Sequence, residues 1–295
     1  MEAKKSLGLP RVVPRSGTKW GQNFLRDKKI LKKIADFAHI ENTDTVVEVG
    51  PGKGTLTEFL LEKSKKVIAV EKDERMVEFL KGKFEKERKE GKFEIVCGDV
   101  LKMSKGTSPR GTLKEFCPKG FPLTPFDTYK LVGNIPYYIT GALFKKFLES
   151  ENQPKSITFV VQKEVAERII KSKKESILSI SIKVYGTPEY GGTIKAGSFN
   201  PKPKVDSAII AVRNISKENF LRCHLRKLEP KGGTLGNLEK KFFEILKAGF
   251  AHKRKLLIKN LDVNKEIFEK CGIPEKVRAE DLNVEDWICL TKNLL

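Results

Sequence analysis

The fold of this chain is decided by the stretch Thr45-Val46-Val47-Glu48-Val49-Gly50-Pro51-Gly52-Lys53-Gly54. Its first half is typical of a buried strand, and its glycines permit a tight turn that lets a ligand approach the backbone. A helix is predicted to begin near Thr55, directly after this turn. This order of strand, turn and helix is typical of α/β proteins, which bind ligands at the carboxyl ends of parallel strands.

Further apolar runs repeat the pattern along the chain. Six more strands are predicted, at residues 66–70, 93–97, 131–133, 157–161, 180–184 and 205–212. Amphipathic stretches separate several of these runs, and strands that alternate with helices favour a mostly parallel, doubly wound sheet. The sequence therefore predicts an α/β fold around a sheet of about seven strands.

Strand signals stop at about residue 214, which predicts a second, smaller domain. Residues 238–261 and 275–294 are predicted to be helical, and residues 227–236 form the loop that enters this domain. Residues 102–128 are polar and rich in Gly and Pro, which indicates a long surface loop. We expect a basic N-terminal arm at residues 1–20, an α/β domain at 21–213 and a helical domain at 214–295.

The charge of the chain favours a polyanionic partner. Its 295 residues include 58 Lys and Arg against 38 Asp and Glu, which gives a formal net charge of +20. A basic excess of this size favours nucleic acid over an anionic membrane, although solubility alone is the alternative that charge leaves open.

The cysteines and histidines give no sign of a disulfide framework or a metal site. The five cysteines are far apart and form no C-x-x-C pair, so we expect them to be reduced, as in an intracellular protein. The three histidines are equally scattered, so no bound metal is expected. No apolar run has the length of a membrane span or a signal peptide, and the expected compartment is the cytoplasm.

Acidic residues at the ends of the predicted strands indicate the cofactor. The spacing G-x-G-x-G at Gly50, Gly52 and Gly54 differs from the dinucleotide fingerprint G-x-G-x-x-G. Glu48 suits S-adenosylmethionine, whose sulfonium and amino groups are cationic. Glu71, 21 residues after Gly50, can accept hydrogen bonds from both ribose hydroxyls, and Asp99 can bind the adenine amine. Their neighbours Lys72 and Val100 are assigned to the same cofactor site.

A second motif, Asn134-Ile135-Pro136-Tyr137, follows the fourth predicted strand. The Asn134 side-chain oxygen and a neighbouring backbone carbonyl can accept both protons of an exocyclic amine on a base. Pro136 favours an extended backbone at Ile135, and Tyr137 offers a flat face for the base. Alone, the tetrapeptide is more often an ordinary turn. Behind the glycine loop, Glu71 and Asp99, it predicts a methyltransferase.

With these motifs in order, the chain resembles the small-subunit ribosomal RNA adenine dimethyltransferases, the KsgA family, over nearly its whole length. The resemblance includes the segment Gln22-Asn23-Phe24-Leu25 and the motifs described above. It extends to residues 161–168, 199–207, 253–255 and 278–282.

The resemblance implies a Rossmann-like class I methyltransferase domain and a helical C-terminal domain. It also implies that methyl groups pass from S-adenosylmethionine to N6 of two adjacent adenosines in small-subunit rRNA, within an immature small ribosomal subunit. By the family pattern, Gln22, Asn23 and Leu25 line the cofactor site, and Phe199 packs on a flipped adenine opposite Tyr137. A flipped base is also what the chemistry needs, because a stacked and paired amine cannot reach a methyl donor. The protein is expected to act as a monomer.

Five basic residues are assigned to RNA binding, two beside Phe199 and three in the C-terminal domain: Lys202, Lys204, Lys253, Arg254 and Lys255. The chain also departs from the family pattern at three places. Residues 102–128 form a longer connection, Tyr138 and Thr140-Gly141 follow the target motif, and Ala251-His252 replaces a polar pair.

The sequence leaves two alternatives open. The first is the related macrolide-resistance family, which methylates one adenosine of large-subunit rRNA. The segments Gln162-Lys163-Glu164 and 203–207 favour the small-subunit family instead. The second is a non-catalytic ribosome-assembly or RNA-binding factor that has kept the fold, against which Asn134 and Glu71 argue.

Overall fold

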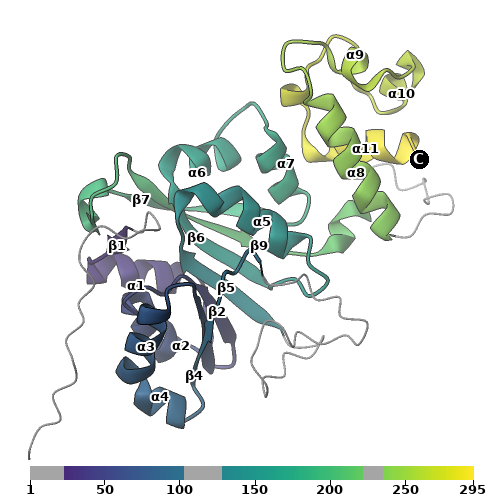
Figure 1. Cartoon of the computed structure of the whole chain (residues 1–295). Coiled ribbons are helices and arrows are strands. Elements are labelled where there is room, and N and C mark those ends of the chain that lie inside the picture. The colour runs from purple at the N-terminus through teal and green to yellow at the C-terminus, as the bar shows by residue number, and fades with distance from the viewer. Residues whose placement is uncertain (1–22, 103–127, 222–234) are drawn as a thin grey trace, which may run out of the picture.

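The computed structural model describes residues 23–102, 128–221 and 235–295. At its centre lies a seven-stranded sheet in the order β4-β3-β2-β5-β6-β9-β7 (Figure 1). The strands are β2 (Thr45–Val49), β3 (Lys66–Glu71), β4 (Phe93–Cys97), β5 (Tyr129–Asn134), β6 (Ser156–Gln162), β7 (Thr187–Ile194) and β9 (Ser207–Arg213). The strands from β4 to β6 are parallel, and β9 is antiparallel to both of its partners. The predicted mostly parallel, doubly wound sheet is confirmed.

Helices cover both faces of this sheet. One set is α1 (Lys28–Phe37), α2 (Thr55–Lys63), α3 (Glu74–Lys83) and α4 (Glu85–Lys89); the other is α5 (Thr140–Leu148), α6 (Lys163–Ile170) and α7 (Ile177–Lys183). Alternate strand residues divide between the faces, since Val46 packs in a cluster with α1 and α2, and Val47 in a cluster with α5 and α6. Strands that are buried on both faces are continuously apolar, which explains the runs that the sequence shows.

The order of the strands reverses between β2 and β5. The chain moves outward from β2 to β3 and β4, then crosses back to β5, which pairs with β2 on its other side. A Cβ atom at Gly133 would lie 2.7 Å from the Val49 carbonyl oxygen, so only glycine allows this close approach. The loops that follow β2 and β5 are therefore neighbours at the point where open α/β sheets bind ligands.

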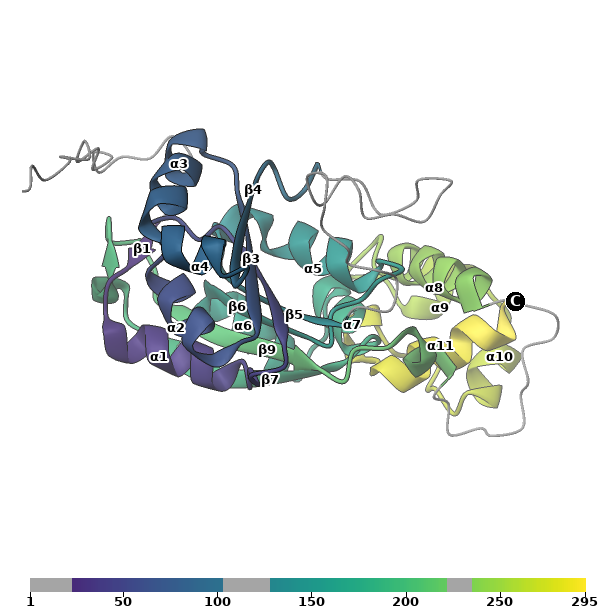
Figure 2. The same cartoon turned by 90° about the horizontal axis from the view of Figure 1, so that it is seen from below.

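The C-terminal helices gather at one end of the molecule, beyond α5 and α7 (Figures 1 and 2). They are α8 (Leu235–Gly249), α9 (Leu257–Leu261), α10 (Lys265–Lys270) and α11 (Val284–Asn293). One apolar cluster runs from the sheet through Tyr185 and Phe220 to Phe242 and Trp287. At this junction the Tyr185 hydroxyl donates a hydrogen bond to Glu239, and Lys217 donates to the same carboxylate at 3.1 Å.

Helix α8 ends earlier than predicted. The sequence suggests one helix at residues 238–261, but a Cβ atom at Gly249 would lie 2.4 Å from the Trp287 ring, and the next residue, Phe250, stacks on that indole. The second predicted helix, at residues 275–294, is regular only from Val284, where the Asn283 side chain caps α11. Tertiary packing and caps therefore set boundaries that periodicity did not show.

The predicted strand at residues 180–184 is wrong, because this segment belongs to α7. Ile180, Ile182 and Val184 alternate with polar residues, a pattern typical of a strand. However, Ser176 caps the helix through reciprocal hydrogen bonds with Ser179. Short as it is, α7 is buried on more than one side, so its apolar residues do not follow a helical period.

Three strands were not predicted. The first is β7, whose Pro188, Gly191 and Gly192 suggest a turn; it tolerates them as an edge strand with a bulge between Tyr190 and Gly192. The other two are β1 (Phe24–Leu25) and β8 (Phe199–Asn200), which form a separate two-stranded sheet. They are too short to show a period.

The expectation that all cysteines are reduced is wrong for two of them. Cys271 and Cys289 form a disulfide that joins the end of α10 to α11. They are 18 residues apart in the sequence, and only the packing of the two helices brings them together. Cys97 is free and exposed, while Cys117 and Cys223 lie outside the described residues.

Several predicted segments also lie outside the described residues: the N-terminal arm, most of the 102–128 loop and nearly all of the 227–236 loop. Three-residue and five-residue 3₁₀ turns complete the described chain: η1 (Tyr137–Ile139), η2 (Ala196–Ser198), η3 (Lys217–Leu221) and η4 (Ala279–Asp281). No helix within the described ranges is long and apolar enough to cross a membrane.

We expect the variant Cys271→Ser/Cys289→Ser to unfold more easily than the wild type under oxidising conditions. A crosslink across 18 residues stabilises a fold by about 3 kcal/mol, mainly by restricting the unfolded chain. Urea titrations with and without reductant measure this difference. Cys97→Ser is the matched control, and an unchanged wild-type midpoint after full reduction of the disulfide would contradict the expectation.

Candidate active site

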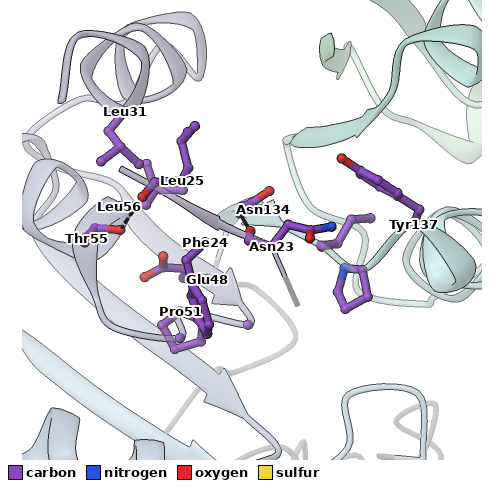
Figure 3. A pocket seen from close by; sticks show the side chains of 14 residues that line it. Asn23, Phe24, Leu25, Leu31, Glu48, Pro51, Thr55, Leu56, Asn134 and Tyr137 are labelled. Atoms are coloured by element: carbon purple, nitrogen blue, oxygen red, sulfur yellow. Dashed lines mark hydrogen bonds between the residues drawn. The ribbon is translucent and has the colours of Figure 1, made fainter. Parts of the chain in front are cut away.

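A hollow lies at the point where the strand order reverses, between the glycine loop and the target motif (Figure 3). Its walls come from the N-terminal segment, from α1 and α2, and from the loops after β2 and β5: Asn23, Phe24, Leu25, Leu31, Glu48, Gly50, Pro51, Gly52, Thr55, Leu56, Asn134, Ile135, Pro136 and Tyr137. The hollow encloses about 40 Å³, room for a few water molecules. A ligand of nucleoside size must therefore extend beyond it along the strand ends.

The glycine loop turns with positive φ angles at Gly50 (68°) and Gly52 (55°). Apart from Gly50 and its two chain neighbours, no described residue has a heavy atom within 4 Å of the position that a Cβ would take at Gly50, so the backbone there faces open space. At Gly52 a Cβ would lie 2.7 Å from the Phe24 ring, which packs directly on the loop. Left-handed backbone next to open space is the geometry that lets a ligand approach closely.

Glu71 lies at the end of β3 and is anchored by the backbone. Its carboxylate accepts hydrogen bonds from the amides of Gly52 (3.1 Å), Lys72 (2.8 Å) and Asp73 (3.0 Å). Burial raises the pKa of Glu71, and these three N–H donors counteract the rise. The carboxylate is thus fixed beneath the glycine loop, with its oxygens oriented by the backbone.

Asp99 lies after β4 and pairs with Lys72. The Asp99 carboxylate accepts from Lys72 Nζ at 2.9 Å and from the Leu101 amide at 3.1 Å. The hydrogen bond from Lys72 is the main cause of a lowered Asp99 pKa. The next residue, Val100, is buried. Glu71 and Asp99 therefore continue the site along the strand ends, outside the walls of the hollow.

Glu48 is the most perturbed carboxyl of the site. It is buried in the wall of the hollow, and its Oε2 accepts a hydrogen bond from the Thr57 hydroxyl at 2.6 Å. Burial raises the pKa of Glu48 to about 8; the Thr57 hydrogen bond opposes this rise, and the charge of Glu71 adds to it. In the free protein at neutral pH, Glu48 is therefore mostly protonated.

The Asn134 amide is held in one orientation. Its Nδ2 donates to the backbone carbonyl of Asn23 at 2.9 Å, a contact drawn in Figure 3. Among the described residues, no donor reaches the Asn134 Oδ1 or the Ile135 carbonyl, whereas the Pro136 carbonyl accepts from the Ile139 amide at 3.2 Å. The motif therefore presents two unused acceptors, one on Asn134 and one on Ile135.

Tyr137 is also fixed, since its hydroxyl lies 2.7 Å from the Ser207 hydroxyl at the start of β9. Phe199 is buried, whereas Asn134 and Tyr137 line the hollow. Its ring is only 5% exposed, packs with Leu25 and Ile194, and does not line the hollow. Strand pairing places Phe199 opposite Leu25 and Asn200 opposite Phe24.

The residues assigned to RNA binding lie in two places. Lys202 and Lys204 are exposed on the loop between β8 and β9, next to the target motif. Lys253, Arg254 and Lys255 are exposed between α8 and α9, in the helical end of the molecule. Gln22 lies outside the described residues.

Comparison with known proteins identifies the family. A family model described as ribosomal RNA adenine dimethylase matches residues 15–294. The chain belongs to this family. A ribosomal RNA small subunit methyltransferase A of Dehalococcoides mccartyi is 37% identical over 98% of this chain and 92% of its own.

Solved structures agree with the fold of this family member. A dimethyladenosine transferase from Plasmodium falciparum matches with a TM-score of 0.69 and 25% identity, over 90% of this chain and 95% of that one. The 23S rRNA methyltransferase ErmE matches with a TM-score of 0.65 and 24% identity, over 92% and 99%. The dimethylase described here thus has the fold of the class I rRNA methyltransferases.

Membership of this dimethylase family makes the protein an S-adenosylmethionine-dependent methyltransferase, and the site fits that cofactor. Gly50 leaves open space where any side chain would intrude. The carboxyl of Glu48, whose ionised form a bound cation would favour, suits the sulfonium and ammonium groups of this ligand, and the oriented carboxylate of Glu71 suits its ribose diol. These acidic side chains suit a cationic ligand that carries a nucleoside better than they suit a pyrophosphate, which is an anion.

The sequence analysis did not assign to the site the lining residues Phe24, Leu31, Pro51, Thr55 and Leu56, or Thr57, which contacts Glu48. Phe24 packs against Gly52, and Lys53 Nζ lies 5.5 Å from the centre of its ring. An aromatic within the family segment Gln22-Asn23-Phe24-Leu25 was the available signal. Thr57 hydrogen bonds to Glu48 across nine residues, and only the turn between strand and helix reveals that contact.

We expect Glu48 to make the stability of the protein depend on pH. The ordinary pKa of a glutamate is 4.5, and the pKa of Glu48 in the folded protein is about 8. Between these values the folded state binds the extra proton, so the free energy of unfolding falls as pH rises, by at most about 1.4 kcal/mol per pH unit. The contribution of protonated Glu48 to the free energy of unfolding is fully present below pH 4.5 and is lost by about pH 8.

Glu48→Gln removes this contribution. Denaturant titrations from about pH 5 to about pH 8.5, which span the ionisation of Glu48, should give a flatter profile for Glu48→Gln than for the wild type. The control is Glu62→Gln, which replaces an exposed glutamate of helix α2. Parallel profiles for the wild type and Glu48→Gln would show that Glu48 ionises normally.

Proposed function

We propose that this protein transfers methyl groups from S-adenosylmethionine to N6 of two adjacent adenosines in small-subunit rRNA, giving N6,N6-dimethyladenosine. Its substrate is an immature small ribosomal subunit in the cytoplasm, on which the protein acts as a monomer during subunit biogenesis. The observation that carries the proposal is the hydrogen bond from Asn134 Nδ2 to the Asn23 carbonyl. It leaves Asn134 Oδ1 as an acceptor at the target end of the cofactor site.

The chemistry rests on orientation of the amine. The lone pair of the adenine amine is delocalised into the ring, and it must leave conjugation before it can attack a methyl group. Asn134 Oδ1 and the Ile135 carbonyl accept the two amine protons and turn the lone pair toward the donor. The Pro136 carbonyl is less suited, because the Ile139 amide already donates to it.

No strong base is needed in this scheme. The methylated amine is cationic and acidic until it loses its proton to solvent, so alignment supplies the main acceleration. After the first transfer a single N–H remains, and one acceptor is enough to hold it. The same pair of acceptors therefore serves both methylations, with one hydrogen bond to the amine in the second transfer instead of two.

The adenine is held on the Tyr137 face, and the hydroxyl contact with Ser207 fixes that ring. We assign Phe199 to the opposite face of the base. Because Phe199 is buried in the free protein, this role requires β8 and its partner β1 to shift as the adenine enters.

The cofactor is assigned to the strand ends. Glu71 accepts from the ribose hydroxyls, Asp99 and Val100 bind the adenine, and Lys72 holds Asp99 in place. The methionine end is assigned to Glu48 and the loop of Gly50, Gly52 and Gly54, beneath Asn23 and Leu25, and the family pattern assigns Gln22 to the same site. We assign residues 21–213 to the methyltransferase domain, residues 214–295 to the rRNA-binding domain and residues 1–20 to a basic arm.

Small-subunit rRNA is favoured over large-subunit rRNA by the relatives. The small subunit methyltransferase A from Dehalococcoides mccartyi is 37% identical over nearly full length. The large-subunit enzyme ErmE, at 24% identity, supports the shared fold alone. A non-catalytic assembly factor is less favoured, because the amine acceptors and Glu71 are all fixed in usable positions.

The function is tested by incubating the purified protein and S-adenosylmethionine with immature small subunits and, separately, with large subunits. Mass mapping should find dimethyladenosine only in the small-subunit rRNA. Asn134→Ala should lower the rate by roughly 10²-fold or more, since the amine is no longer aligned, while S-adenosylmethionine binding stays near wild type.

The control is Asn264→Ala, an exposed asparagine whose side chain makes no capping hydrogen bond. Modification of large subunits instead would support the macrolide-resistance alternative. Loss of cofactor binding together with activity in Asn134→Ala would contradict the amine-aligning role.

We expect Lys253, Arg254 and Lys255 to bind rRNA phosphates. Replacing all three with alanine should reduce the slope of log affinity against log salt by about 2, because each phosphate contact to a single strand contributes about 0.7. The matched control is the triple alanine variant of Lys86, Arg88 and Lys89, which removes the same charge from the exposed surface around α4. Equal slopes for the two triple variants would count against this interface.

A further inference from the structure

The most exposed aromatic side chain of the described residues lies directly beside the target motif. Large hydrophobic side chains exposed within the described ranges are Phe79, Tyr138, Ile177, Val205 and Leu295, and Tyr138 has the largest exposed fraction, 71%. Tyr138 follows Tyr137 in η1. It makes no hydrogen bond or ring contact with another described residue. The fold therefore does not explain why an aromatic side chain is present there.

A second exposed side chain, Val205, belongs to the loop next to η1. The hydroxyls of Tyr137 and Ser207 lie 2.7 Å apart and join the two segments. Asp206 anchors the same loop, since its carboxylate accepts from the Ala196 amide at 2.9 Å and its carbonyl from the Lys163 amide at 3.0 Å. Two of the exposed hydrophobic side chains thus come from segments that meet at the mouth of the site.

The loop also carries positive charge. Lys202 and Lys204 are exposed and form no ion pair with another described residue. We call Tyr138, Lys202, Lys204 and Val205 the target rim. An aromatic ring, an aliphatic side chain and two available ammonium groups make up the set that binds single-stranded nucleic acid, through base stacking and phosphate contacts.

The chemistry of the proposed substrate supplies an occupant for this rim. When one adenine enters the site between Asn134 and Tyr137, the neighbouring nucleotide loses a stacking partner. That neighbour is attached through one phosphate, so its base must lie close to the mouth of the site. An exposed ring one residue after Tyr137 is placed to replace the lost stacking.

We propose that Tyr138 is the platform of a second nucleobase subsite, which takes the base next to the adenosine under methylation. This inference rests on the proposed function. Val205 borders the subsite, and Lys202 and Lys204 bind the phosphates that flank the two nucleotides. Because every base has a flat face, the subsite accepts the second target adenosine whether it is unmodified or already dimethylated.

Binding of a short single-stranded RNA with two adjacent adenosines tests the subsite. Tyr138→Ala should weaken binding by about tenfold or more, as expected for loss of one base–aromatic stack. Tyr138→Phe keeps the ring and should bind like the wild type. Phe79→Ala, which removes an exposed aromatic from α3, is the matched control and should also bind normally.

A second RNA has an abasic nucleotide in place of one of the two adenosines, so that the remaining adenosine has no neighbouring base there. With the first RNA it completes a double-mutant cycle between the Tyr138 ring and that neighbouring base. If the ring stacks on the neighbouring base, Tyr138→Ala should have no further effect on this RNA. An equal loss on both RNAs, or no loss on either, overturns the subsite.

Methylation of immature small subunits separates the two proposals. A wild type that modifies no adenosine there refutes the proposed function itself. A wild type that modifies both adenosines, beside a Tyr138→Ala variant that matches it in rate and in RNA binding, refutes only the subsite.

Discussion

The parallel pairing of β2 with β5 is the constraint on which the site depends. It joins two strands far apart in the sequence, and the glycine at position 133 lets them approach until a Cβ would meet the Val49 carbonyl. The loops after these strands carry the cofactor turn and the target motif. Since both loops leave the same edge of the sheet, the residues proposed to hold the methyl donor and those proposed to hold the acceptor amine lie next to one another.

The segment Asn23-Phe24-Leu25 connects the parts of this site. Its first carbonyl orients the Asn134 amide, its phenyl ring packs on Gly52, and its last residue pairs with Phe199. A shift of the glycine loop would therefore reach, within three residues, the groups that we assign to the adenine. Bound cofactor and bound base are expected to influence each other's affinity through this short strand, because neither site can move it without disturbing the other.

The sequence predicted those parts of the fold that depend on local pattern. The strand at 45–49, the helix from Thr55, Glu71 at the end of β3 and Asp99 after β4 all follow from one rule, that ligands bind at the carboxyl ends of parallel strands. The sequence predictions were wrong where caps and tertiary packing determine the secondary structure. Apolar residues of α7 alternate as in a strand, but Ser176 caps the segment as a helix, and Gly191 in β7 accommodates the Phe37 ring. Contacts across long separations, such as Cys271 with Cys289 or Asn134 with Asn23, leave no trace in local sequence.

A basic segment remote from the catalytic cleft can orient RNA only if the two ends of the protein move as one. The junction here meets that condition. A continuous apolar cluster joins the sheet to α8 and α11, and Glu239 accepts hydrogen bonds from both Tyr185 and Lys217 on the sheet side. A further link ties Lys174 to Glu280, and the Glu175 amide donates to the Glu280 carbonyl at 2.7 Å. In the proposed function, phosphate contacts at the helical end would position the RNA strand at the cleft, and the base next to the target adenosine would fix which nucleotide enters the site.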